Sequence, residues 1–101
     1  MIEAARTALD FASGRTLSEF RDDLQFQFAV TRALQILLEA ASRVHPETRA
    51  RAPTIEWAQM NGMRNRLVHA YFSTDLDILW RTVTDRLPDL LSALEDLRRA
   101  T

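Results

Sequence analysis

The scarcity of helix-breaking residues is the feature that most constrains the fold of this chain. Its 101 residues include only two glycines and three prolines. The alternation of apolar and polar side chains that marks a β-strand is nearly absent, and residues of high helix propensity dominate. The sequence therefore predicts an all-α protein, an up-and-down helical bundle of four to five helices.

Turn signals set the limits of the first two predicted helices. The first covers about residues 2–12 and stops at Gly14. A long second helix ends at His45, because the Pro46 that follows disfavours helical geometry in the residue before it. We expect His45 to cap this C-terminal end. The apolar positions of the long helix cover more than one face, so it must pack on several neighbours or on another subunit.

The second half of the chain predicts three further helices. After a polar connector over residues 46–53, Thr54 is a suitable N-cap for the third helix. A fourth helix is expected from about Asp75, and a new helical segment is expected to begin at Thr84. Pro88 then lies in the first turn of a fifth helix, where its missing N–H costs little.

Composition excludes several classes of protein. A chain of this length forms one domain, here residues 1–101. The absence of cysteine removes disulfides, thiol catalysis and cysteine-based zinc sites. Two histidines at unrelated positions do not make a metal site, so we expect neither a metal nor a cofactor. No apolar run spans a bilayer and the first residues do not form a secretory signal, which favours a cytoplasmic location without membrane contact.

The charge pattern limits how any nucleic acid would be bound. The formal net charge is -1, so general attraction to polyphosphate is absent and a local patch is required. All thirteen basic side chains are arginines. Arginine suits bidentate contact with phosphate, although a compositional bias of the source genome is the simpler explanation.

The residues that point to chemistry are concentrated in the third predicted helix. Arg64, Asn65, His69 and Tyr71 all lie in one short stretch. Arginine carries a permanent positive charge for a phosphate and histidine moves protons near neutral pH, which is what metal-free cleavage of RNA requires. Asn65 and His69 are four residues apart, so the amide can orient the imidazole. The alternative is a solvated helix with ordinary surface residues, since an Arg-x4-His spacing also arises by chance.

Helix geometry adds a condition on this hypothesis. Arg64 and His69 are five residues apart and therefore diverge by roughly 140° around an ideal helix. One straight helix does not aim both at one atom. A distorted helix end would bring them together, and so would a second copy of the helix across a two-fold axis, where two arginines and two histidines would line one groove.

With its surroundings, this stretch resembles the HEPN superfamily, and within it the HepT-type toxins of bacterial and archaeal toxin–antitoxin pairs. The family motif, in this branch Arg-x4-His-x-Tyr, matches Arg64 through Tyr71. Trp57 precedes it at the family's spacing, and Leu87-Pro88 resembles the start of the last helix. Glu39-Ala40-Ala41 resembles a Gly-Glu-Ala segment of the long helix, with Leu38 in place of glycine. The resemblance covers nearly the whole chain and departs from the family at a shorter first helix.

The resemblance implies a metal-independent ribonuclease toxin that works as a homodimer, with the motifs of both subunits facing one cleft. Arg64 would stabilise the scissile phosphate and His69 would transfer protons, while Asn65 would orient His69 or contact the phosphate. It also implies an antitoxin, a minimal nucleotidyltransferase (MNT) that attaches AMP to Tyr71. AMPylation there would place negative charge and bulk where the substrate phosphate must sit.

Two other hypotheses stay open. Many related helical proteins resemble non-catalytic subunits of nucleotidyltransferases that bind nucleotide or present a substrate. In that case Arg64 clamps a phosphate and His69 only shapes a pocket. In the third hypothesis the protein is a structural dimeric bundle without chemistry. RNA cleavage that depends on Arg64 and His69 would distinguish the first hypothesis from both.

Overall fold

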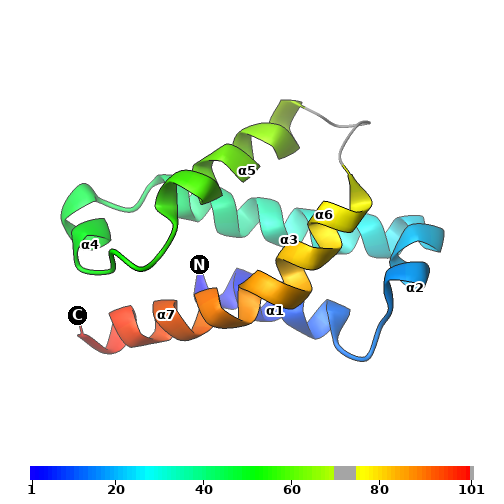
Figure 1. The fold of residues 1–101 in the computed structure, drawn as a ribbon, viewed down its shortest axis with the longest axis horizontal. Coiled ribbons are helices and arrows are strands. Elements are labelled where there is room, and N and C mark those ends of the chain that lie inside the picture. Colours follow the sequence, from blue (N-terminus) through cyan, green and yellow to red (C-terminus); the bar gives the residue numbers. More distant parts are fainter. Residues whose placement is uncertain (70–74, 101) are drawn as a thin grey trace.

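The computed structural model describes residues 1–69 and 75–100, except for the side chains of Val68 and His69, as a bundle of helices (Figure 1). Seven α-helices and one π-helical segment make up these residues, which contain no strand. The predicted all-α fold class is confirmed. Within the same residues no helix is long and apolar enough to cross a membrane.

Helix α3 (Leu24–Ser42) runs through the middle of the bundle (Figure 1). Helix α1 (Ile2–Ala12) and helix α5 (Trp57–His69) both pack against it. Because α3 meets several neighbours, it needs apolar side chains on more than one face, as the sequence predicts. Its buried residues are Phe26, Val30, Ala33, Leu34, Leu37, Leu38 and Ala41.

Local turn chemistry sets where the first helices end and begin. Gly14 lies just after α1 with a φ of 71°, a left-handed conformation that glycine adopts without steric cost. Thr16 and Glu19 form a reciprocal capping box at the start of helix α2 (Leu17–Asp22). The side chain of Asp23 caps α3. These caps satisfy backbone N–H groups that would otherwise lack partners.

His45 caps a different helix end from the predicted one. Helix α3 already ends at Ser42. The Nδ1 atom of His45 accepts a hydrogen bond of 3.1 Å from the backbone N–H of Glu47, which makes His45 the N-cap of the short helix α4 (Pro46–Ala50). A proline at the first helical position has a φ suited to starting a helix, so Pro46 begins one here.

The helix that carries the motif begins two residues later than predicted. Helix α5 starts at Trp57, and Thr54 lies in the turn before it. In that turn the N–H of Ile55 bonds to the carbonyl of Ala52, and the N–H of Trp57 bonds to the carbonyl of Ile55. Ile55 is buried, so core packing holds the turn and delays the helix.

The last helix is continuous where the sequence predicts a break. Helix α6 (Leu76–Arg81), the π-helical segment η1 (Thr82–Arg86) and helix α7 (Leu87–Ala100) follow one another directly. Figure 1 shows a change of direction between α6 and α7. Pro88 would clash with the carbonyl four residues before it in a regular α-helix. The wider π-helical turn accommodates the proline ring without ending the helix.

Aromatic rings and one ion pair fasten α6 to the start of the bundle. Phe20, Phe26 and Trp80 form a cluster whose ring centroids lie 5.2 to 5.8 Å apart. Beside it, a terminal nitrogen of Arg21 donates to Asp77 Oδ2 at 2.6 Å, and Nε donates to Oδ1 at 3.0 Å. These contacts fix the position of α6, the helix that follows the motif.

Candidate functional site

The predicted phosphate-binding arginine lies where α5 packs against α3. This residue is Arg64, and its Nε donates a hydrogen bond of 2.9 Å to Oε1 of Glu39. The two side chains are 33% and 38% exposed, so solvent reaches the pair. No acceptor among the described residues engages the two terminal nitrogens of Arg64. These nitrogens remain available as a fork for a phosphate.

The pair also keeps the carboxylate charged. The hydrogen bond from Arg64 lowers the pKa of Glu39 below its usual 4.5, partial desolvation opposes this, and attraction to Arg64, Arg43 and Arg32 lowers it further. The carboxylate is therefore ionised at neutral pH. Since it binds only Nε, it orients the guanidinium while leaving the far edge of that group accessible.

A small hollow of about 170 Å³ opens beside this pair. Arg32, Gln35 and Glu39 of α3 line one side, and Arg64 and Leu67 of α5 line the other. The three α3 residues are three and four positions apart, which places them on one face of that helix. Two guanidinium groups against one carboxylate leave one positive charge in excess. The hollow is therefore suited to an anionic group.

The remaining motif residues are placed only in part. Asn65 is exposed on α5, and its side chain forms no hydrogen bond with the described part of the chain. Helix α5 stays α-helical through His69, so no distortion of the described backbone turns that residue back toward Arg64. The His69 side chain and the whole of Tyr71 lie outside the described residues. The contact between Asn65 and His69 stays a prediction.

Apolar packing fixes α5 in position beneath these polar residues. Met60 and Leu67 are buried in the core, while Trp57 and Met63 pack against it. The indole Nε1 of Trp57 also donates a hydrogen bond of 3.2 Å to the carbonyl of Ala52. These apolar contacts hold the part of the α5 backbone that carries Arg64.

Glu39, Arg32 and Gln35 are the site residues to which sequence reasoning assigned no role. Their spacing on α3 is a detectable signal, because it places three polar side chains on one face of a helix rich in apolar residues. What the spacing does not reveal is that this face meets Arg64. That contact joins two residues that are 25 positions apart in the chain.

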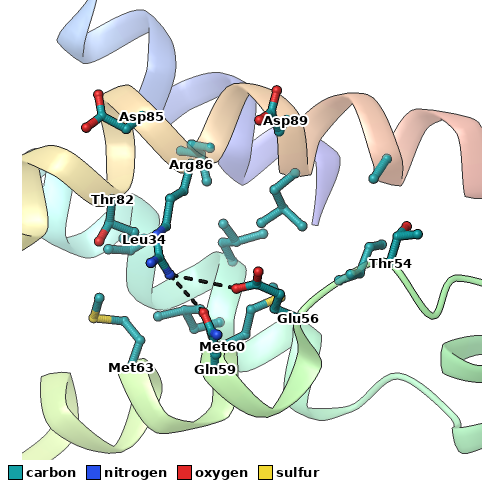
Figure 2. A pocket seen from close by; sticks show the side chains of 16 residues that line it. Leu34, Thr54, Glu56, Gln59, Met60, Met63, Thr82, Asp85, Arg86 and Asp89 are labelled. Atoms are coloured by element: carbon teal, nitrogen blue, oxygen red, sulfur yellow. Dashed lines mark hydrogen bonds and ion pairs between the residues drawn. The ribbon is translucent and has the colours of Figure 1, made fainter.

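A larger groove lies between α5 and the η1–α7 helix (Figure 2). Its volume is about 320 Å³, and α3 supplies apolar lining such as Leu34. Arg86 reaches across it from η1, donating a 2.8 Å hydrogen bond to Gln59 and approaching the Glu56 carboxylate at 3.8 Å (Figure 2). Met63 lines the groove, but Arg64 and Asn65 do not. Among the described residues, no group of three or more His, Cys, Asp or Glu is placed to hold a metal ion.

Comparisons with known proteins converge on one family. The family model described as Ribonuclease HepT-like matches residues 1–97. A protein of Thermococcus cleftensis named "Probable ribonuclease HepT" is 37% identical over 97 residues, which cover 96% of this chain and 88% of that relative. A protein of Methanocaldococcus jannaschii whose name gives it as an inferred RNase is 32% identical over 95 residues, covering 94% and 87%. No solved structure matches the chain.

Proposed function

This chain belongs to the family of HepT-like ribonucleases, and on that premise we propose that it is a metal-independent endoribonuclease toxin with Arg64 and His69 as its catalytic residues. The names of its relatives support ribonuclease activity. The observation that carries the proposal is the setting of Arg64. Glu39 holds one edge of its guanidinium, and the residue lines a hollow with excess positive charge.

The proposed reaction is a transesterification on the RNA backbone. The ribose 2′-oxygen attacks the adjacent phosphorus as its proton passes to a neutral imidazole of His69. The bond from phosphorus to the 5′-oxygen breaks, and that oxygen takes a proton from an imidazolium. The products are a 2′,3′-cyclic phosphate and a 5′-hydroxyl. The terminal nitrogens of Arg64 stabilise the negative charge that builds on the phosphoryl oxygens in the transition state.

The site requires two copies of the chain. Because α5 is regular through His69, Arg64 and His69 of one protomer diverge by roughly 140°. A two-fold arrangement resolves this by pairing Arg64 of one protomer with His69 of the other. Helix α3 supports such an arrangement, because it exposes large apolar side chains that a second copy would cover. They are Leu24, Phe28 and Ile36. Arg32 lies between the last two on the same face, so the proposed contact must leave Arg32 at the edge of the shared cleft.

Cleavage of RNA by the purified protein in the presence of EDTA tests the catalytic assignment. We expect Arg64→Ala and His69→Ala to slow cleavage by about 10²- to 10⁴-fold, as loss of one positioned group does. Arg66→Ala is the matched control, because Arg66 is exposed on the same helix and has no ion pair with the described residues. Unchanged cleavage in both variants would overturn the assignment. A dimer that binds nucleotide yet leaves RNA intact would support the non-catalytic subunit instead.

Mixed dimers test whether the site is shared. We expect Arg64→Ala and His69→Ala homodimers to be inactive, while a heterodimer of the two regains activity. The heterodimer holds one intact pairing of Arg64 from one protomer with His69 from the other. If each protomer carried a complete site of its own, mixing would restore nothing.

The proposal extends to regulation through Tyr71. This residue follows His69 by two positions, so an adenylate on its hydroxyl would bring a negative phosphate close to the catalytic groups. Co-expression with a nucleotidyltransferase antitoxin should add the mass of AMP to the wild type but not to Tyr71→Phe. Modification at another residue, or none, would overturn this part.

A further inference from the structure

The hollow beside Arg64 continues along α3, away from the Arg64–Glu39 pair. We propose that Arg32 and Gln35 form a second subsite, which binds the phosphate next to the scissile one in a single-stranded RNA. This inference rests on the proposed ribonuclease function. It concerns how the substrate is held, not how it is cut.

The direction of the two helices places the subsite along the path of a strand. Helices α3 and α5 run in opposite directions (Figure 1). Glu39 contacts Arg64, while Gln35 and Arg32 line the same hollow one and two turns nearer the start of α3. Seven residues of helix separate Glu39 from Arg32 by about 10 Å along the axis. Two long arginine side chains at that separation can reach consecutive phosphates of one strand.

Arg32 is available to an anion in a way that several other arginines are not. Arg15 and Arg21 are each paired with acidic side chains. Arg32 is exposed and forms no ion pair or hydrogen bond with the described residues. The nearby carboxylate of Glu39 is already bound by Arg64. A phosphate would therefore meet a guanidinium that no carboxylate of the described residues binds directly, and Glu39 attracts it only at longer range.

Gln35 supplies a neutral donor at the same place. It is half-buried between Arg32 and Glu39 on the face that lines the hollow. An amide N–H commonly binds phosphate oxygens of nucleic-acid backbones, alongside arginine. Because neither residue type reads base edges in this role, the subsite should position the strand without selecting its sequence.

Substrate length gives a readout that separates this subsite from the catalytic centre. A dinucleotide contains only the scissile phosphate, whereas oligonucleotides extended on either side contain neighbouring ones. We expect Arg32→Gln to lower kcat/KM about five- to tenfold on the extended substrate, mainly through KM, and to leave the dinucleotide within about twofold. The slope of log affinity against log salt should fall by about 0.7, the value of one phosphate contact on a single strand. Gln35→Ala should give a smaller change of the same kind.

Arg43→Gln is the matched control. Arg43 caps the same helix and is also exposed, but it does not line the hollow. Removing it subtracts the same charge from α3, so it should leave the preference for extended substrates intact. An equal effect of Arg43→Gln would mean that general charge, not a subsite, holds the strand.

Binding of an uncleavable strand keeps the subsite and the chemistry apart. With 2′-O-methyl RNA, the wild type should bind the extended strand about five- to tenfold more tightly than Arg32→Gln does. If this holds while no RNA is ever cut, the ribonuclease proposal fails and the subsite stands. If RNA is cut but Arg32→Gln matches the wild type, slows both substrates equally or dissociates the dimer, the subsite is overturned.

Discussion

The two depressions on this bundle differ in size and in the state of the groups that line them. The groove between α5 and η1–α7 is the larger, about 320 Å³ against about 170 Å³. Its arginine, Arg86, is engaged with Gln59 and Glu56. The hollow between α3 and α5 instead presents Arg32 and the far edge of Arg64 to solvent. By volume alone, the groove would be the candidate active site. The hollow is the better candidate, because its guanidinium groups are still able to bind and stabilise a negative charge.

The largest expected effect comes from removing one arginine from each depression. Arg64→Ala should lower kcat/KM for RNA by about 10²- to 10³-fold, because an electrostatic contact to the transition state is lost. Arg86→Ala should leave it within about twofold. Steady-state cleavage of one defined oligonucleotide measures both. A large loss with Arg86→Ala would mean that the groove takes part in the reaction.

The next effect concerns stability in the groove. Leu34 lines its floor and is 1% exposed. Leu34→Ala should lower the free energy of unfolding by about 2 to 4 kcal/mol, because it removes buried methyl groups and leaves a cavity. Denaturant unfolding measures this change. The activity per folded molecule should stay within about twofold. That result would show that the groove does not bind the substrate.

A substitution in the hollow should have the opposite effect and change activity more than stability. Glu39→Gln keeps the size of the side chain but removes the charge that orients Arg64. We expect kcat to fall about tenfold because the guanidinium is misplaced, while KM stays level or falls because one negative charge leaves the site.

Glu56→Gln is the matched change in the groove and should alter neither constant. Glu56 meets Arg86 only at 3.8 Å and both are largely exposed. If Glu39→Gln leaves kcat unchanged, the role of Glu39 as a positioning residue is wrong.

The sequence predicted the fold more securely than the helix limits, for a physical reason. The near absence of glycine, proline and strand alternation affects the whole chain, so the all-α class followed from it. Individual limits depend on single residues whose signals have two meanings. Pro46 is compatible with ending one helix or starting the next, and Pro88 stays within a helix because η1 widens before it.

The same distinction applies to the site. Arg64 and Asn65 could be proposed from the sequence because the motif is contiguous. The partner of Arg64 could not, because Glu39 approaches it only through the packing of α5 on α3. A sequence shows which residues share a helix face, but the register between two packed helices depends on side-chain volumes along their whole interface. The subsite residues Arg32 and Gln35 were missed for the same reason.

The smallest expected effect is the pH dependence of the Glu39–Arg64 pair, and it sharpens the contrast between the depressions. The hydrogen bond from Arg64 lowers the pKa of Glu39 in the folded chain below its usual 4.5. A lowered pKa contributes stability that is fully present above the unfolded value and is lost as pH falls through the folded value. The difference in Tm between the wild type and Glu39→Gln should therefore be constant from neutral pH down to about 5.5 and shrink below about 4.5.

Because Arg64 is the main cause of the shift, the variant Arg64→Gln provides the control. In that background the acid-dependent difference in Tm that Glu39→Gln causes should largely disappear, and high salt, about 1 M, should reduce it in the wild-type background. A difference that persists in the Arg64→Gln background would mean that Arg32 and Arg43, and not Arg64, hold the carboxylate. Glu39 would then offset the positive charge of the surrounding arginines without orienting Arg64. Arg64 would lose the contact that holds its free edge toward a phosphate.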